Sequence, residues 1–475
     1  MFCKLLSHFP RRSWMSIRHY VRLPSVEDAK DPLKILKHDL VDGRLDKILP
    51  CPRECDVLII GGSVVGSSIA YFLKEQQNKL NVMVVEADSS YSSASALLSV
   101  GGMRQQFSRR ENIEMSQFGF EFLRRASQLL AVRGEPPPDV QFNHAGYLIL
   151  ADKDNADTML KNHEIQTECG AVSTLLSADM LKKKYPWINT DGIELATVGC
   201  QGEGWFDPAA LLSGLRGKNR SQDVPYVNGK VIGFEYEKIR LSGEKRYHKL
   251  DFALVQLPNG DVQPVRAALF VNATGPHAGE VAQMAGIGDE NISAVCAVPL
   301  PVEPRKRYVY TLHCVNGPGL DCPLVADSSQ NFVYLRREGL GNNYICGMSP
   351  PADMEHDHSD LTVDYNFFDE HIWPKLAHRM PAFEALKVVG AWAGYYDYNF
   401  IDQNLIIGAH PYFKNMYFAN GSSGHGLQHA PAMGRAITEL INYQEYRTVD
   451  LNAFAFDRFL ETDDMDSLGG ETNVV

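Results

Sequence analysis

A glycine-rich turn near the start of the chain has the spacing of a phosphate-binding site. The apolar run DVLII at 56–60 is followed by GGSVVG at 61–66, by SSIAYFLKEQ, and by NVMVVE, which ends at Glu86. This order predicts a strand, a turn, a helix and a second strand. The start of such a helix offers free N–H groups and a positive dipole end to a pyrophosphate, and an acid at the end of the second strand accepts hydrogen bonds from ribose hydroxyls. The sequence therefore predicts a dinucleotide-binding unit.

The positions within the turn have separate physical reasons. Gly61 permits the tight turn, and Gly66 lets the helix pack closely on the strand. Ser63 stands where a glycine ordinarily lets the backbone approach the phosphates. Because serine is small and its hydroxyl can donate, we expect weaker binding rather than none. The structural alternative is an α/β turn that binds no nucleotide.

The turn alone does not distinguish FAD from NAD. The sequence contains no second GxGxxG and no CxxC pair, both of which a pyridine-nucleotide disulfide reductase needs. We therefore expect electrons to enter from a small substrate. Nine irregularly spaced cysteines also indicate reduced thiols and no metal site.

Other segments predict further elements. A loop rich in serine and alanine spans 89–107, and a helix is expected over about 111–133. Strands are predicted at 146–151, in several runs between 295 and 348, and at 267–275. The segment MYFANGSSGHG at 416–426 predicts a strand that opens into a glycine-rich loop, followed by a helix with Pro431 near its first turn.

Composition limits the class of protein. A chain of 475 residues is long for one hydrophobic core, so two domains are expected. Hydrophobic residues make up 44% of it and the mean hydropathy is -0.22, and no run approaches the roughly 18 to 20 apolar residues that span a bilayer. Any membrane association would therefore be peripheral. A formal net charge of -12 argues against nucleic acid as a partner.

The first 26 residues differ from the rest. They contain five basic residues, several serines and scattered apolar residues, with no acidic residue before Glu27. This composition predicts a mitochondrial transit peptide at 1–26, and the alternative is a disordered basic tail. The expected location is the mitochondrion, in the matrix or at the matrix face of the inner membrane. Residues 27–53 are interpreted as a linker and 461–475 as a C-terminal tail.

Seven motifs occur in the order of a known family: DVLIIGGSVVG, GGMR, GYLILA, GWFDPAALL, VNATGPHAGEVAQMAG, GAWAGYY and NGSSGHGLQHAP. They resemble the D-amino-acid oxidase superfamily, which includes sarcosine oxidases, sarcosine and dimethylglycine dehydrogenases, and glycine oxidases. The resemblance implies an α/β (α+β) fold that holds FAD between two interleaved domains. The Rossmann-type FAD-binding domain would comprise 54–137, 201–290 and 388–460. The substrate domain, with a mixed and largely antiparallel sheet, would comprise 138–200 and 291–387.

The resemblance also assigns residues. It implies catalytic positions at Arg104, which would bind a substrate carboxylate beside the flavin, and at Tyr308, Tyr395 and His425. The residues implied to bind FAD are Gly61, Gly62, Ser63, Val65, Gly66, Glu86, Ala87, Ser93, Gly102, Met103, Arg104, Thr274, Gly275, Gly421, Gly424, His425, Gly426 and Leu427. For the tyrosines and His425, ordinary packing or structural hydrogen bonding is the alternative.

Two departures from relatives bear on the chemistry. Gln428 stands where monomeric sarcosine oxidases have a lysine that helps to hold the substrate carboxylate. The loop 89–107 contains no histidine or cysteine, and Gly394 replaces the flavin-linked cysteine of some relatives. FAD is therefore expected to be held non-covalently.

The segments GGMRQQFS, PVEPRKRYVY and WAGYYDYNFIDQN resemble one mitochondrial branch of the family, which is implicated in the assembly of respiratory complex I. This resemblance implies complex I subunits or assembly intermediates as partners. The alternative function is oxidation of a secondary amine or N-methyl amino acid in the matrix, with a small amine or amino acid as substrate. A third interpretation is a scaffold that no longer binds FAD.

Overall fold

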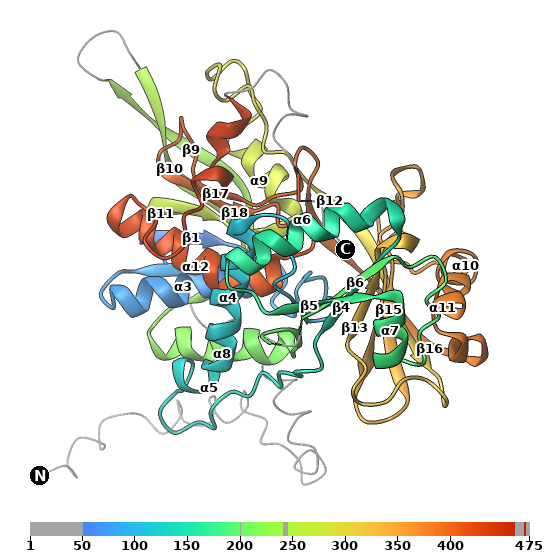
Figure 1. Cartoon of the computed structure of the whole chain (residues 1–475). Coiled ribbons are helices and arrows are strands. Elements are labelled where there is room, and N and C mark those ends of the chain that lie inside the picture. Colours follow the sequence, from blue (N-terminus) through green and yellow to red (C-terminus); the bar gives the residue numbers. More distant parts are fainter. Residues whose placement is uncertain (1–50, 200, 241–245, 461–469, 472–475) are drawn as a thin grey trace, which may run out of the picture.

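The computed structural model describes residues 51–199, 201–240, 246–460 and 470–471. Two large sheets lie side by side, the FAD-side sheet at the left of Figure 1 and the substrate-side sheet at its right. The predicted transit peptide, residues 27–50 of the predicted linker, and all but two residues of the predicted tail lie outside the described residues.

The FAD-side sheet is parallel at its centre. In spatial order its main strands are β17 (Ile406–Ala409), β18 (Met416–Asn420), β11 (Val262–Asn272), β1 (Glu54–Ile60), β2 (Val82–Glu86) and β8 (Tyr226–Asn228). The strands from β18 to β8 are all parallel to their neighbours, and β17 is antiparallel to β18. The hairpin of β9 (Lys230–Arg240) and β10 (Arg246–Gln256) extends from β11 and projects from the body (Figure 1).

Alternation along β1 explains how this sheet is covered on both faces. Val57 and Ile59 pack against helix α3 (Val64–Gln76), whose Ile69 and Leu73 are fully buried. Leu58 and Ile60 point to the other face, where they join a cluster with helix α9 (Ala278–Met284). Because side chains alternate along the strand, β1 contributes apolar residues to the core on each face of the parallel sheet.

Helix α12 (Gly426–Tyr443) packs along α3. A Cβ on Gly434 would lie 2.4 Å from Ser68 Oγ, so the two helices approach closely because this position is glycine. Pro431 was predicted near the first turn of α12. It is the sixth residue of this helix and therefore lies in the second turn.

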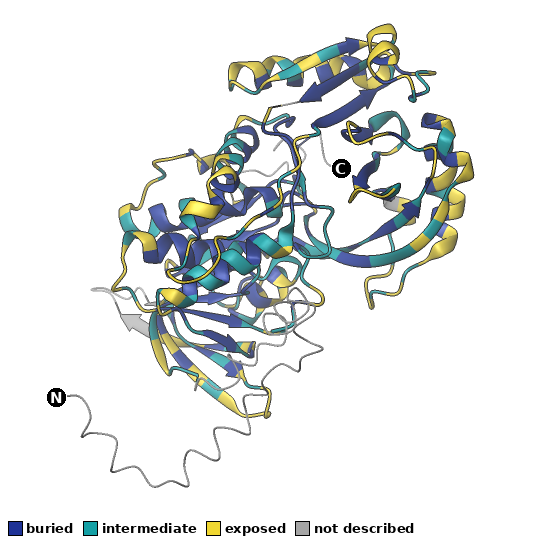
Figure 2. Cartoon of the chain, turned by 90° about the horizontal axis from the view of Figure 1, so that it is seen from below, coloured by how far each residue is buried: buried dark blue, intermediate teal, exposed yellow. Residues whose placement is uncertain are grey.

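The substrate-side sheet is antiparallel except where β13 and β4 pair in parallel. In spatial order its strands are β16 (Lys387–Asn399), β12 (Val302–His313), β15 (Asn343–Gly347), β14 (Val333–Glu338), β13 (Leu324–Asp327), β4 (Tyr147–Ala151), β6 (Leu195–Gly199) and β5 (Ser173–Ser177). Its outer face is covered by α10 (Tyr365–Phe367), α11 (Trp373–Arg379) and the segment between them. In Figure 2 the strands of both sheets are largely buried, and exposed residues gather on the outer helices and loops.

Two predicted boundaries differ from the structure. The predicted FAD domain resumes at 388, but β16 pairs with β12 along its whole length and belongs to the substrate-side sheet until Asn399. The helix predicted over 111–133 is two helices, α4 (Arg110–Arg124) and α5 (Ala126–Leu129), which meet at Arg125. Within the described part of the chain, every helix is too short or too polar to cross a membrane.

Candidate active site

A cavity of about 490 Å³ lies where the two sheets meet. Its walls come from the turn after β1, the loop after β2, strands β12 and β16, and the loop that leads into α12. This volume falls within the range of pockets that enclose small molecules and cofactors. Segments far apart in the sequence therefore build one site.

The glycine-rich turn forms one end of the cavity. Gly61 has a φ of +98°, which strains any residue with a side chain. A Cβ on Gly66 would lie 1.9 Å from the carbonyl oxygen of Gly61. Gly66 does not line the cavity, but it lets α3 begin close to β1, which gives the turn its shape.

Ser63 lines this end of the cavity and precedes α3 as its N-cap residue. Its hydroxyl does not cap the helix, and the oxygen is buried with no hydrogen-bond partner among the described residues. The hydroxyl of Ser95, in the loop after β2, also lines the cavity and is buried with no hydrogen-bond partner among the described residues. The orphaned hydroxyl of Ser63 at the positive end of a helix fits an oxygen of a diphosphate, so the serine in the turn is compatible with FAD.

Glu86 lines the cavity at the end of β2. One carboxylate oxygen accepts the backbone N–H of Gly62 at 2.8 Å, and the other accepts that of Asp88 at 2.9 Å. Burial raises the pKa of this carboxyl, and the two N–H donors oppose that rise. Each oxygen keeps a lone pair, which suits the predicted contact with ribose hydroxyls.

Two asparagines that the sequence analysis missed connect the ends of β11 and β18. Asn272 accepts the hydroxyl of Thr274 at 2.7 Å, and Asn420 accepts the backbone N–H of Gly275 at 3.2 Å. Asn420 also donates to the carbonyl of Asn272 at 2.8 Å. Thr274 and Gly275, which are predicted to bind FAD, line the cavity because this pair of asparagines fixes their turn.

The loop before α12 is held by a carboxylate of β16. Asp397 accepts the backbone N–H of Ser422 at 2.9 Å and its hydroxyl at 2.5 Å, and the Asp397 carbonyl accepts the N–H of Ser423. Gly424, Gly426 and the start of α12 face the cavity. The first N–H groups of this helix have no partner within the helix, so they present positive charge to a bound anion or reduced flavin.

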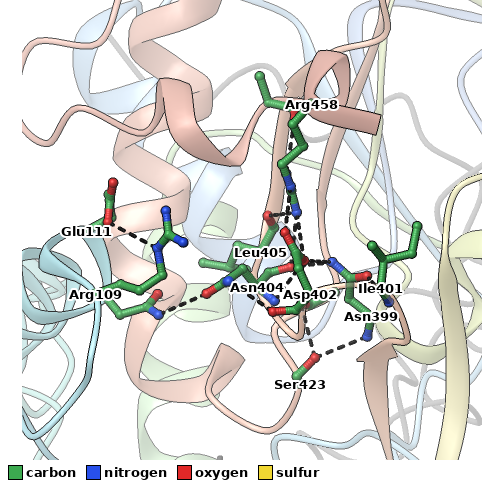
Figure 3. Close-up of polar contacts among 12 residues, drawn as sticks. Arg109, Glu111, Asn399, Ile401, Asp402, Asn404, Leu405, Ser423 and Arg458 are labelled. Carbon is green, nitrogen blue, oxygen red and sulfur yellow. Dashed lines mark hydrogen bonds and ion pairs between the residues drawn. The ribbon is translucent and has the colours of Figure 1, made fainter. Parts of the chain in front are cut away.

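A polar network supports this loop from behind (Figure 3). Arg458 donates to both carboxylate oxygens of Asp402, at 2.8 and 3.2 Å. Asp402 accepts Asn399 Nδ2 at 2.6 Å, and the backbone N–H of Asn399 donates to Ser423 Oγ at 3.1 Å. The C-terminal segment thereby fixes the backbone of the glycine-rich loop.

Arg104 is 3% exposed and lines the cavity. Its Nη1 donates to the carbonyl of Gln106 at 2.8 Å, and its Nη2 lies 3.0 Å from His425 Nε2. The guanidinium lies over the ring of Phe107, 4.3 Å from the centroid. The charge predicted to bind substrate is therefore at the cavity wall, in one fixed orientation.

His425 is a neutral partner of this arginine. Burial, together with the Arg104 charge, holds its pKa well below the ordinary value. Since arginine only donates, Nε2 of His425 accepts and Nδ1 carries the proton. His425 therefore positions Arg104 through an Nε2 that the guanidinium already occupies, as the structural hydrogen-bonding alternative describes.

Gln428 has a role different from that of the lysine it replaces. Its Oε1 accepts the backbone N–H of Arg104 at 2.8 Å. The side chain is buried and adds no positive charge to the cavity. It joins α12 to the short strand β3 (Gly102–Met103), which pairs with β7 (Gly204–Trp205).

The prediction for Tyr308 is wrong, and that for Tyr395 is only partly right. Residues alternate along β12 and β16, so Arg307 and Tyr396 face the cavity while Tyr308 packs in the core on the other face. Tyr395 contributes to the cavity wall, but its hydroxyl donates outward to the carbonyl of His358 at 2.8 Å. Both predictions are displaced by one residue.

Arg307 and Tyr396, neither of them among the predicted catalytic residues, form this wall of the cavity. Arg307 donates to both oxygens of Glu355 and to the hydroxyl of Tyr396, all at 2.8 Å. Burial lowers the pKa of Arg307, but Glu355 outweighs it and keeps the guanidinium charged. Arg307 is thus a charge paired with a carboxylate at the cavity wall.

The remaining predicted cofactor residues divide into two groups. Val65, Ala87, Ser93, Gly102 and Leu427 line the cavity. Met103 does not line the cavity, because its side chain is fully buried in a core cluster, so its contact with FAD stays a prediction. Gly62 and Gly421 shape their turns from behind the lining; a Cβ on Gly62 would lie 3.0 Å from the Tyr91 hydroxyl.

The described residues contain no cluster of metal-ligating side chains, and those that line the cavity include no cysteine. Non-covalent attachment of FAD stays a prediction. The donors and glycines described above fit FAD, with Ser63 at the expected place of the diphosphate and Glu86 at that of the ribose.

The fold and the cavity define a two-domain flavoprotein oxidoreductase. A family model described as FAD dependent oxidoreductase (DAO) matches residues 56–440, and the chain belongs to this family. Over 416 residues it is 50% identical to the FAD-dependent oxidoreductase domain-containing protein 1 of Xenopus laevis, an alignment that covers 86% of this chain and 83% of that protein.

More distant relatives share the architecture. Glycine oxidase of Bacillus subtilis is 23% identical over 415 residues, which is 86% of this chain and 98% of that enzyme. The crystal structure of L-proline dehydrogenase from P. horikoshii superposes with a TM-score of 0.71 at 24% identity, covering 86% of this chain and 99% of that one. These likenesses confirm the predicted fold class, and the match to the family of FAD-dependent oxidoreductases confirms FAD as the cofactor.

Proposed function

We propose that this protein oxidises a carbon–nitrogen bond of a small amine or amino acid that carries an acidic group. One observation carries the proposal: Arg104 lies at the cavity wall with a fixed guanidinium beside the loop that leads into α12. Relatives whose names specify glycine or L-proline as substrates agree with this class of reaction.

The charges around the cavity favour an anionic group on the substrate. Burial lowers the pKa of His429 to about 3, and His425 is neutral as well, so neither histidine adds a cation beside Arg104. The Arg104 guanidinium lies at the cavity wall, where an anionic group of a substrate can meet it. A planar guanidinium binds a carboxylate through two hydrogen bonds.

The other side chains exclude water and orient the substrate. Val309, Leu324 and Met348 line the substrate side with apolar surface, and the Tyr396 hydroxyl, which accepts from Arg307, keeps its own proton to donate. FAD, when bound, supplies the acceptor for the hydride removed from the carbon beside nitrogen. Positioning of a neutral amine carries much of this catalysis.

An anaerobic titration tests the proposal. FAD-loaded protein is mixed with a panel of secondary amines and amino acids, and the visible flavin absorption is followed. We expect one class of acidic amine to bleach the flavin, and Arg104→Ala to keep FAD but lose bleaching by about a hundredfold or more in rate, since a charged hydrogen-bonding pair is lost. A flavin that stays oxidised with every compound contradicts the proposal.

We propose a second role in the mitochondrion, at the matrix face of the inner membrane, in the assembly of respiratory complex I. Its support is the basic composition of residues 1–26 and the specific motifs, such as PVEPRKRYVY, that resemble the complex I-linked branch. The use of Gln428 to brace Arg104 rather than to hold substrate agrees with a protein whose main role is not turnover. Subunits or assembly intermediates of complex I would be the partners.

Complementation separates the two roles. Cells that lack the protein receive either the wild type or Arg104→Ala, and complex I is measured by native electrophoresis. We expect the wild type to restore complex I and the variant to restore it equally, because the substitution alters the cavity and not the surface. Normal complex I in cells without the protein contradicts an assembly role.

A further inference from the structure

Glu203 is a buried carboxyl to which none of the motifs described above assigns a role. It is 1% exposed and lies directly before β7, in the segment that pairs with β3. A Cβ on Gly199 would lie 2.1 Å from Glu203 Oε2, so the glycine at 199 is what admits this carboxylate. A carboxyl with so little solvent needs a structural or functional reason.

The carboxylate holds the two residues that follow Arg104. Oε1 accepts the backbone N–H of Gln105 at 2.8 Å, and Oε2 accepts Gln106 Nε2 at 2.7 Å. Gln106 Nε2 also donates to the carbonyl of Tyr147 at 2.9 Å, which ties the segment to the substrate-side sheet. Glu203 thereby fixes both glutamines of the segment 104–106.

The same segment carries the acceptor that orients the guanidinium. The Gln106 carbonyl receives Arg104 Nη1 at 2.8 Å, and the backbone N–H of Arg104 donates to Gln428. A displacement of Gln105 and Gln106 would therefore move an acceptor that helps to set the guanidinium plane. His425, which lies directly before α12 and contacts Arg104 Nη2, comes from a different segment and can serve as an independent support.

We propose that Glu203 is a positioning residue that sets the Arg104 guanidinium for the acidic group of the substrate. The inference rests on the proposed function, because it assigns Arg104 to a substrate anion. Glu203 touches neither substrate nor cofactor in this account. It acts through the backbone of Gln105 and Gln106.

The positioning role of Glu203 should depend on pH, because protonation of its carboxylate weakens the hydrogen bonds that it accepts. Burial raises its pKa to about 7, and the Gln105 and Gln106 donors and the Arg104 charge oppose that rise. The charged and titratable groups that face it are Arg104 beside β3 and the Tyr147 hydroxyl on β4. An ionised carboxylate is the stronger acceptor, so the Gln105 N–H is held more tightly above pH 7 than below it.

Hydrogen exchange tests the positioning without turnover. In FAD-loaded wild type, we expect the protection of the Gln105 amide, corrected for its intrinsic rate, to rise about tenfold between pH 6 and pH 8, the size of a charge-assisted hydrogen bond. Glu203→Gln should remove this rise. Glu439→Gln is the matched control, because Glu439 is an equally buried carboxylate that holds Arg447 and Thr448 at the far end of α12.

A second measurement reports on Arg104. Sodium acetate is titrated against the flavin spectrum, and we expect its Kd to rise about tenfold in Glu203→Gln and to be unchanged in Glu439→Gln. If Glu203→Gln does not retain FAD, Glu203→Asp keeps the charge one methylene further away and should show an intermediate rise in the Kd.

Unchanged exchange and an unchanged Kd in these variants overturn the proposal for Glu203. Acetate that leaves the wild-type flavin spectrum unperturbed contradicts the proposed function instead, so the two failures are distinguishable.

Discussion

The phosphate-binding turn shows which residues tolerate substitution and which do not. Ser63 departs from the expected glycine, yet its hydroxyl is buried in the cavity lining, has no partner in the part of the chain that the structure describes, and can donate to a ligand. Gly61 and Gly66 allow no such freedom, because positive φ and a carbonyl at 1.9 Å leave no room for a Cβ. The sequence pattern predicted all three positions, because each follows from the local geometry of one turn.

Substitution of Gly66 is expected to prevent the protein from retaining FAD. In Gly66→Ala the new Cβ collides with the Gly61 carbonyl, and the backbone cannot retreat without moving β1. We expect about 1–3 kcal/mol of destabilisation and loss of most FAD, measured by the ratio of flavin to protein absorbance and by the thermal midpoint. Gly217→Ala is the control, since nothing lies within 4 Å of its Cβ and alanine favours the helix α8 (Pro208–Ser221). A Gly66→Ala protein that purifies with full FAD would show that the turn can relax.

At the level of elements, the sequence predicted most strands but not which way their side chains point. Tyr308 was expected in the pocket, yet Arg307 faces it, because an apolar and basic run on a strand covered on both faces has no clear alternation. The contact of Glu203 with Gln105 joins residues 98 positions apart, and no local pattern encodes such a pairing. The strand β16 was assigned to the wrong domain for the same reason, since its partner β12 lies far away in sequence.

The buried ion pair of Arg458 and Asp402, which lies behind the glycine-rich loop, is expected to be important for stability. Arg458→Met leaves the Asp402 carboxylate buried and without its cation, which costs about 3–5 kcal/mol, and releases the backbone that Asn399 holds at Ser423. We expect a lower thermal midpoint and weaker FAD retention. Arg124→Met breaks the exposed pair with Glu121 on α4 and should change stability by less than about 1 kcal/mol. Equal effects of the two substitutions would contradict this role.

The whole molecule buries several histidines in their neutral form. Burial lowers the pKa of His410 to about 4 and of His429 to about 3, and that of His425 well below its ordinary value. As the pH falls from about 6.5 to 4.5, the unfolded chain gains a proton at each of them and the folded chain does not, so stability is lost. Glu203 has the opposite effect, because its pKa of about 7 in the folded chain exceeds its value in the unfolded chain. It releases a proton on unfolding in this pH range and so offsets the proton taken up by one of the three histidines.

Acid should therefore destabilise the protein steeply. These four groups together predict a loss of about 3 kcal/mol per pH unit between pH 6.5 and 4.5, from a net uptake of about two protons on unfolding. His410→Asn keeps an acceptor for the Tyr412 and Phe413 N–H groups and should make the decline shallower by about half. The free energy of unfolding in urea at several pH values measures both, with His358→Asn, an exposed histidine, as the control. Parallel pH profiles for wild type and His410→Asn would refute the assignment.

The interleaving of the two sheets has a consequence for biosynthesis. The phosphate turn belongs to the first part of the described chain, but its supporting helix α12 and the strand β18 come almost at the end. A ribosome delivers these pieces long after the turn, so a nascent chain cannot secure the flavin until β18 and α12 have emerged. FAD therefore binds only late in synthesis, and we expect a chain that terminates anywhere before Met416 not to bind FAD.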